Sequence, residues 1–295
     1  MKNYVCIDIG GTEIKFGLVN EQGQIMCKEK MRTEAHQGGR EILKKIMNIV
    51  ETYQGKLEIS GVGISTAGIV DTIKGAIYHA GPTIPEYTGI KFKETIESVF
   101  QIPCEVENDV NCAGLAEVVS GAAVGYRYGV MLTVGTGIGG CVLMDGNVFH
   151  GAKGCAGEIG YMNIQGGCFE QMGAASTLVK NVAKKKNQQE SEWDGYRVFE
   201  GVRQGDLECT EAVDEMADIL GKGIANLCYI LNPEIVILGG GIMAQEEVLR
   251  PRIEAAMEKY LIPVIAKSTK VTFAKHKNDA GMLGAFYHLI QKQTE

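Results

Sequence analysis

Tyr4-Val-Cys-Ile-Asp-Ile-Gly-Gly-Thr-Glu-Ile-Lys-Phe-Gly-Leu-Val19 reads as an apolar strand, a turn of glycine and threonine, and a second apolar strand. The same pattern returns in Gly129-Val-Met-Leu-Thr-Val-Gly-Thr-Gly-Ile-Gly-Gly-Cys-Val-Leu-Met144. Glycine turns expose backbone N–H groups, and such groups bind phosphate oxygens well. Two of these hairpins in the two halves of one chain predict a phosphate clamp formed by two lobes.

Composition and charge indicate a soluble protein with two domains. The chain has 295 residues, of which 45% are apolar and 22% charged, an ordinary globular composition. Its net charge of −7 argues against nucleic-acid and anionic-membrane partners, which need clustered Lys and Arg. Nine scattered cysteines without a Cys-x-x-Cys pair fit a reducing compartment. Because we find neither a signal peptide nor a run of about 18 apolar residues, we expect a cytoplasmic protein.

Hydrophobic periodicity predicts strands followed by helices twice along the chain, which is typical of an α/β architecture with a repeated sheet. The strands are expected at 4–9, 14–19, 24–31, 59–64, 104–107, 129–134, 140–144, 235–238 and 271–274. The helices are expected at 39–54, 92–100, 111–120, 173–186, 194–202, 208–231, 245–260 and 279–291. A first lobe over 1–120 and a second over 121–279 follow, with the final helix, about 280–295, packing back on the first lobe.

The first hairpin offers the parts of a phosphate site. Gly10 and Gly11 leave the turn bare, and Thr12 adds a hydroxyl. Asp8 can hold Mg²⁺ through water, and Lys15 follows one strand step beyond the turn. A plain β-hairpin with a glycine turn remains the alternative.

The second hairpin contains Gly135-x-Gly137-x-x-Gly140, which matches the dinucleotide fingerprint as a bare pattern. A dinucleotide fold needs a helix directly after these glycines, whereas 141–144 reads as a strand. The glycines still suit phosphate, but from a β-hairpin.

Two acidic segments could serve a sugar substrate. Asn108 and Asp109 lie where a strand passes into a helix, and a carboxylate there could accept the proton of an attacking hydroxyl. Helix capping by Asp109 is the alternative. Glu158 sits in a glycine-rich frame and could bind a sugar diol, or it is an ordinary turn carboxylate. Gly239-Gly-Gly241 could place a flat base against the backbone, and the Asp279–Gly284 segment could be a close helix-packing contact.

Taken in order, these segments resemble the ROK family of sugar kinases, which are built on the actin/hexokinase-like (ribonuclease H-like) ATPase fold with a cleft between two lobes. The matching segments are Asp8-Ile-Gly-Gly-Thr-x-x-Lys15, Ser65-Thr-Ala-Gly-Ile-Val-Asp71, Glu107-Asn-Asp-Val-Asn111, Leu132-Thr-Val-Gly-Thr-Gly-Ile-Gly-Gly140, Gly154-x-x-Gly-Glu-Ile-Gly160, Ile237-Leu-Gly-Gly-Gly241 and the segment that starts at Asp279. The resemblance implies an ATP-dependent kinase that phosphorylates a sugar hydroxyl, usually the one on C6. It also suggests a homodimer.

The resemblance implies a role for each matched residue. Asp109 would be the catalytic base, and Asn108 with Glu158 would hold sugar hydroxyls. Asp8 and Thr12 would position ATP with Mg²⁺. The remaining nucleotide contacts would come from Gly10, Gly11, Lys15, Thr136, Gly137, Gly139, Gly239 and Gly240, with Gly240 facing the adenosine.

One departure from the family pattern concerns zinc and the sugar. ROK proteins commonly have His after Gly-Glu-Ile-Gly and then a cysteine cluster that binds structural zinc; here that position is Tyr161, and only Cys168 remains of the cluster. Because structural zinc needs four N or S ligands, we expect no zinc site. Tyr161 could stack on a sugar or aglycone, or simply pack.

This departure resembles the zinc-free branch that includes β-glucoside kinases, so a β-glucoside such as cellobiose is the favoured substrate. N-acetylmannosamine kinase and glucokinase are the alternatives. A sugar-responsive ROK regulator is a distant alternative, since regulators carry an N-terminal helix-turn-helix and this chain is expected to begin its first strand at about Tyr4.

Overall fold

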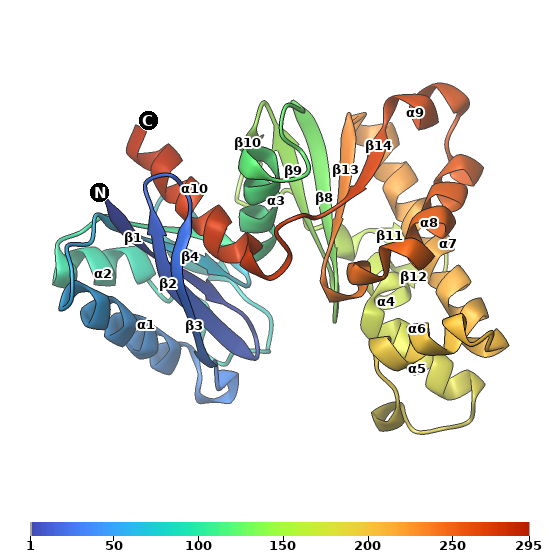
Figure 1. Cartoon of the computed structure of the whole chain (residues 1–295), viewed down its shortest axis with the longest axis horizontal. Coiled ribbons are helices and arrows are strands. Elements are labelled where there is room, and N and C mark those ends of the chain that lie inside the picture. Colours follow the sequence, from blue (N-terminus) through green and yellow to red (C-terminus); the bar gives the residue numbers. More distant parts are fainter. Residues whose placement is uncertain (1, 295) are drawn as a thin grey trace. The chain divides into compact units, whose positions relative to one another are not determined.

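The computed structural model describes residues 2–294, which divide into two compact units (Figure 1). The first unit comprises residues 2–121, 148–156 and 278–294, and the second comprises 122–147 and 157–277. The segment 148–156, inside the range expected for the second lobe, thus groups with the first unit. Among the described residues, no helix has the length and apolar content needed to cross a membrane.

The first unit is built on a five-stranded sheet with the strand order β3-β2-β1-β4-β7. Its strands are β1 (Asn3–Ile9), β2 (Glu13–Asn20), β3 (Ile25–Arg32), β4 (Gly61–Thr66) and β7 (Cys104–Asn108). The first three are antiparallel, and β1, β4 and β7 run parallel. Every residue of β4 is buried, as expected for a central strand covered on both faces.

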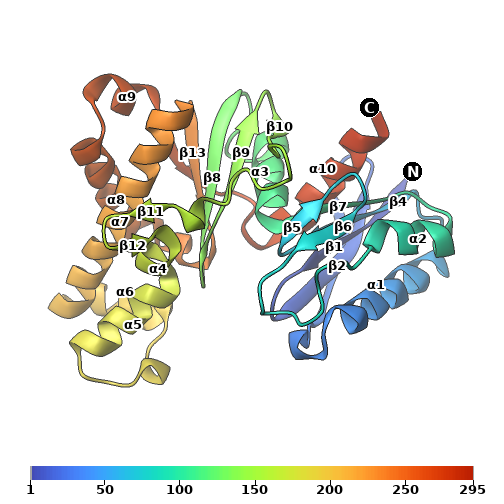
Figure 2. The same cartoon turned by 180° about the vertical axis from the view of Figure 1, so that it is seen from behind.

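Helices cover both faces of this sheet (Figure 2). They are α1 (Gly39–Gln54), α2 (Phe92–Phe100), α3 (Asp109–Ser120) and α10 (Ala280–Thr294). Alternate β1 side chains serve the two faces: Val5, Ile7 and Ile9 pack in the core that contains the apolar stripe of α1, whereas Tyr4 and Cys6 pack against α10. The final helix therefore belongs to the core of the first unit.

No strand or helix was expected within 67–88, but this region contains a small hairpin of β5 (Ile69–Asp71) and β6 (Ala76–His79). Glycine and proline dominate the sequence signal here, and strands of three and four residues are too short to show a period. α3 also begins at Asp109, two residues before the expected start.

The second unit repeats the sheet with the strand order β10-β9-β8-β13-β14. Its strands are β8 (Tyr128–Val134), β9 (Ile138–Met144), β10 (Asn147–Val148), β13 (Ile235–Gly239) and β14 (Lys270–Phe273). β8 and β9 pair antiparallel, and β8, β13 and β14 run parallel. Each sheet thus has a glycine-turned hairpin followed by two parallel strands, so the repeated topology read from the sequence is confirmed.

Helices of the second unit form its apolar core around α7 (Leu207–Leu231). The others are α4 (Phe169–Gly173), α5 (Ala175–Lys185), α6 (Gly195–Arg203), α8 (Glu246–Tyr260) and α9 (Pro263–Ser268). A two-stranded ribbon of β11 (Asn163–Ile164) and β12 (Gly167–Cys168) precedes α4. The short helix α9 was not expected from the sequence.

Candidate functional site

The turn of the first hairpin is held by hydrogen bonds and is exposed to solvent at its tip. Gly10 N donates to Glu13 O at 3.0 Å, and the Thr33 hydroxyl donates to Gly10 O at 2.6 Å. Gly11 and Thr12 are exposed, and a Cβ at Gly11 would meet only a methyl carbon 3.9 Å away. Glycine at position 11 is therefore not required by packing, and the bare turn leaves room for a ligand to approach the backbone.

Asp8 lies directly across the hairpin from Lys15, whose Nζ is 3.7 Å from Asp8 Oδ2. The Ser65 hydroxyl, from β4, donates to Asp8 Oδ1 at 2.8 Å. A Cβ at Gly281 would be 2.4 Å from the same carboxylate, so the start of α10 presses bare backbone against it. Burial raises the pKa of Asp8, although Ser65 and Lys15 oppose that shift.

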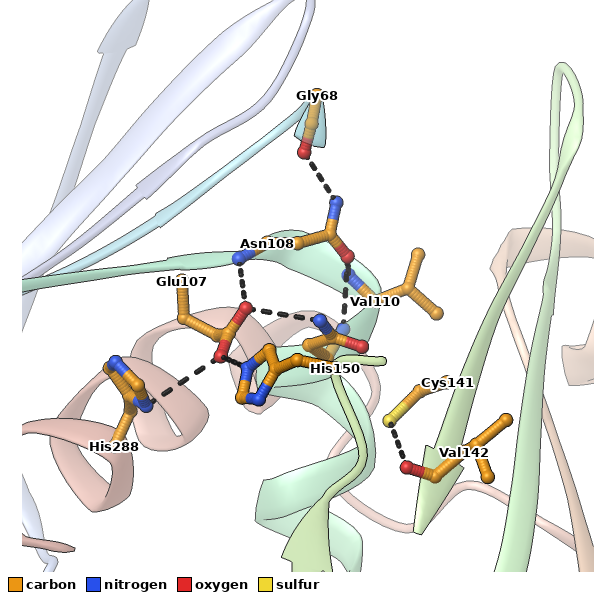
Figure 3. A network of polar contacts seen from close by, with 9 residues as sticks. Gly68, Glu107, Asn108, Val110, Cys141, Val142, His150 and His288 are labelled. Carbon is orange, nitrogen blue, oxygen red and sulfur yellow. Dashed lines mark hydrogen bonds and ion pairs between the residues drawn. The ribbon is translucent and has the colours of Figure 1, made fainter. Parts of the chain in front are cut away.

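Asp109 is the first residue of α3, and the residue that caps the helix is Asn108 rather than Asp109. Asn108 Oδ1 accepts from Val110 N at 2.9 Å and from Asn111 N at 3.1 Å, while its amide donates to Gly68 O (Figure 3). This corrects the alternative in which Asp109 was the cap. The half-buried Asp109 therefore does not serve as the cap, although its position in the first turn also suits the positive end of the helix dipole.

The surroundings of Asp109 favour its protonated form. Burial, followed by the like charge of Asp8, raises the pKa of Asp109 to about 7. Hydrogen bonds from Val110 N and the Asn108 amide, each 3.0 Å from Oδ1, oppose this shift. A carboxylate whose pKa lies near neutrality is suited to accept a proton in catalysis.

The turn of the second hairpin joins β8 to β9, a strand and not a helix, which confirms that it is no dinucleotide fingerprint. Gly135 N donates to Gly137 O at 2.9 Å, and Thr136 at the tip is exposed. The start of α5 holds the turn in place: Ala175 N donates to Gly135 O at 2.9 Å, and Ser176 Oγ donates to Thr136 O at 2.6 Å.

Glu170 is an acidic neighbour of this turn that the sequence did not single out. A Cβ at Gly137 would be 2.6 Å from Glu170 Oε2, and one at Gly160 would be 3.3 Å from the same oxygen. Glu170 lies in α4, far along the chain from both hairpin strands, so no local pattern marks it. Gly139, also expected at phosphate, lies in β9 and is half-buried.

The segment that holds Glu158 is shaped by packing against β9. Gly157 has a φ of +92°, and a Cβ there would be 2.7 Å from Gly140 O. Glu158 is exposed, and Tyr161, at the end of a 3-10 turn, is 70% exposed. Tyr161 is therefore not a core residue, which removes the packing alternative for its side chain.

The glycine triplet after β13 has mixed explanations. Gly239 is buried, and a Cβ there would be 2.7 Å from Met131 Cε. Gly240 has a φ of +99°, and a Cβ there would be 2.2 Å from Val134 O. Gly241 is exposed with no neighbour that would block a Cβ. Close packing on β8 and a positive φ thus account for Gly240. At Gly239 the obstacle is the flexible end of a methionine side chain, and Gly241 borders open space.

In the segment where the zinc ligands common in the family are missing, Cys168 is the remaining cysteine. Cys168 Sγ donates to Gly160 O at 2.8 Å. Within residues 2–294, no three His, Cys, Asp or Glu side chains are grouped so that they could hold a metal ion. The absence of structural zinc stays a prediction that metal analysis can check.

Two sheets of identical strand order, each opening with a glycine-turned hairpin, define the actin/hexokinase-like class of ATPase folds. Asp109, which the family resemblance implies to be the catalytic base, lies at the start of the helix that follows β7. The chain belongs to the ROK family, whose model matches residues 4–292.

Named relatives agree with this assignment over nearly their whole lengths. A glucokinase of Halalkalibacterium halodurans is 29% identical over 99% of this chain and 96% of its own. A β-glucoside kinase of Listeria monocytogenes is 29% identical over 98% of both chains. An uncharacterized protein of Clostridium perfringens is 49% identical over 97% of both chains.

Solved structures show the same fold. A ROK glucokinase from Streptomyces griseus, in complex with glucose and AMPPNP, superposes with a TM-score of 0.83 at 27% identity over 96% of this chain and 97% of its own. A ROK protein from Streptococcus pneumoniae, in complex with sucrose, gives 0.86 at 26% identity over 99% of both chains. The chain is an ATP-dependent carbohydrate kinase.

Proposed function

We propose that this kinase transfers the γ-phosphoryl group of ATP to the 6-hydroxyl of a hexose or hexoside, with Asp109 as the catalytic base. The proposal rests on Asp109 itself: it starts α3 without serving as the cap, and its pKa is raised to about 7. The sugar hydroxyl would give its proton to Asp109 while its oxygen bonds to the γ-phosphorus, and ADP would leave with the broken bridge oxygen.

The other expected residues are assigned by the same proposal. Asn108 and Glu158 would bind sugar hydroxyls, with the Asn108 amide exchanging one of its present side-chain hydrogen bonds for the sugar. The turns at Gly10, Gly11 and Thr12 and at Thr136 and Gly137 would lie against phosphates. The Gly10 N–H donates to Glu13 O, so other backbone N–H groups of the turns would be the donors. Lys15, Gly139, Gly239 and Gly240 would complete the nucleotide contacts.

Asp8 fits the Mg²⁺ that accompanies ATP. Its carboxylate accepts a single hydroxyl hydrogen bond, and its charge raises the pKa of Asp109, so a cation held by oxygen ligands would relieve this repulsion. Mg²⁺ would neutralise charge that develops on the phosphates. We further propose action in the cytoplasm, which the nine free thiols favour, and a homodimer as in the family expectation.

For the acceptor we favour a β-glucoside such as cellobiose. Tyr161 presents its ring to solvent, and an exposed aromatic plane beside Glu158 suits stacking on a second sugar unit. The Listeria relative named as a β-glucoside kinase supports this choice. Glucose is the second candidate, supported by the relative named as a glucokinase.

A coupled ADP-release assay tests the acceptor. We expect cellobiose to give a higher kcat/KM than glucose or N-acetylmannosamine. Tyr161→Ala should lower kcat/KM for cellobiose about tenfold, the equivalent of about 1.4 kcal/mol of lost stacking, and change that for glucose less. Tyr196→Ala is the matched control, since that ring is 72% exposed on α6. A preference for glucose that is unchanged in Tyr161→Ala would contradict the β-glucoside proposal.

The pH dependence of the reaction reports on Asp109. Only the ionised carboxylate can take a proton, so kcat/KM for the sugar should rise as the pH is raised through about 7. An unperturbed aspartate would place this limb near pH 4. Initial rates between pH 5 and 9, with the coupling enzymes in excess, measure it. A rate that stays level down to pH 5 would exclude the perturbed Asp109 as the base.

A further inference from the structure

Glu107 is a buried carboxylate placed just before the proposed sugar-binding and catalytic residues. Its side chain is 1% exposed and lies in β7. Oε1 accepts from Asn108 N at 2.7 Å and from Asn111 Nδ2 at 3.0 Å. One carboxylate oxygen thus holds both the last residue of β7 and the first turn of α3 (Figure 3). Asp109 is the first residue of that helix.

The other oxygen of Glu107 faces two histidines. His150 Nε2 lies 2.5 Å from Oε2, and His288 Nδ1, from α10, lies 3.6 Å from it (Figure 3). His150 is in the segment 148–156, which groups with the first unit. Ala156 N donates to His150 O at 3.1 Å, and Gly154 packs on Val70 O, so this segment is a closed loop seated on β5 and on Glu107.

Charge strengthens this contact. Burial acts to raise the pKa of Glu107, but the hydrogen bond with His150 and the nearby imidazoles outweigh it and hold the pKa below the usual range. The hydrogen bond to Glu107 raises the pKa of His150, against burial and the more distant Lys292. The other titratable groups that face the pair are His288 on α10 and Cys112 on α3. The contact therefore favours the charged form of each partner, the Glu107 carboxylate and the His150 imidazolium.

We infer that Glu107 and His150 are positioning residues for phosphoryl transfer. Glu107 fixes the backbone that carries Asn108 and Asp109. His150 attaches the loop 148–156 to the same carboxylate, and Glu158 follows two residues after the end of this loop. One buried ion pair thus orders two stretches of chain that carry proposed sugar-binding and catalytic groups. Neither residue is assigned contact with the reacting atoms. The inference rests on the proposed function, because the residues that it positions are those of the proposed reaction.

The test compares His150→Gln, which keeps a polar side chain but no charge, with His150→Lys, which keeps the charge. We expect His150→Gln to lower kcat about 10- to 100-fold, the loss that follows when reacting groups are misplaced by about 1 Å, while KM for ATP changes less than about twofold. His150→Lys should recover most of the rate. His36→Gln, an exposed histidine of the same unit, should behave like the wild type.

The pH profile separates positioning from a merely structural role. With the wild type, kcat should fall on the alkaline side as His150 loses its proton, above its ordinary pKa of about 6.5. This limb should be absent in His150→Gln and move to higher pH in His150→Lys. A full kcat in His150→Gln, or a lowered melting temperature with kcat unchanged, overturns the inference. Equal loss of kcat in both variants overturns it as well, since charge would then not matter.

The same experiment distinguishes this inference from the proposed function. If Asp109→Asn is inactive and His150→Gln has full activity, the positioning role fails and the base assignment stands. If Asp109→Asn has the wild-type rate, the proposed function fails whatever the His150 variants do.

Discussion

Asp109→Asn is expected to lower kcat for sugar phosphorylation by about a thousandfold. Asparagine keeps an oxygen that can accept from Val110 N, so the start of α3 is preserved, but it cannot take the proton of the attacking hydroxyl. General bases contribute about 10²–10⁴ in rate, and the larger part of that range applies where the base has a pKa near the working pH. Steady-state kinetics of ADP release at pH 8 with saturating sugar measures the loss.

The controls for Asp109→Asn follow from electrostatics. Because burial and the charge of Asp8 raise the pKa of Asp109 to about 7, the ionised form is disfavoured in the fold. The fold is therefore favoured while Asp109 is protonated and loses stability as the pH rises through that value and the carboxyl ionises. At pH 8 the neutral Asn should leave the melting temperature equal or higher. ATP binding should be retained. A variant that keeps more than about a tenth of the wild-type kcat would fall outside the range for a general base and contradict the assignment.

Both hairpins were predictable because their causes are local. The order of the strands within each sheet was not predicted, because it depends on pairing between segments far apart in the chain. Alternating and continuous apolar runs give strands, and a bare glycine turn between two such runs gives a hairpin. The β8–β9 hairpin shows how context decides: 141–144 was expected to be a strand and is one, which excludes the dinucleotide interpretation of Gly135-x-Gly137-x-x-Gly140. The sequence motifs were therefore sufficient to predict the fold and the class of reaction.

Other features depend on contacts between residues far apart in the chain, and no local sequence pattern predicts them. Asn108, and not Asp109, caps α3, a difference of one residue that only backbone geometry decides. Glu107 stood inside a recognised motif, but its partners His150 and His288 lie 43 and more residues away. The 148–156 segment joins the first unit although the chain before and after it belongs to the second.

The Asp279–Gly284 segment supports the helix-packing alternative, and this leads to a large expected effect on stability. α10 crosses α3 so closely that a Cβ at Gly284 would lie 1.9 Å from Cys112 O and 2.3 Å from its carbonyl carbon. Both contacts are with backbone, which cannot turn aside as a side chain can. α10 also covers one face of the sheet through Met282, Phe286 and Leu289, so a shift of the helix disturbs that core.

Gly284→Ala is therefore expected to lower the free energy of unfolding of the first unit by about 3 kcal/mol, the upper part of the usual range for overpacking. Alanine in place of glycine would by itself favour a helix by about 1 kcal/mol, so a net loss requires the clash to exceed this gain. Gly195→Ala is the matched control, because it also replaces a helical glycine by alanine, and no atom lies within 4 Å of the added carbon. Urea denaturation followed by circular dichroism should show the midpoint lowered in Gly284→Ala and unchanged or raised in Gly195→Ala. Equal midpoints in the two variants would mean that α10 moves away from α3 at little cost, and the close packing of these helices would then not be a source of stability.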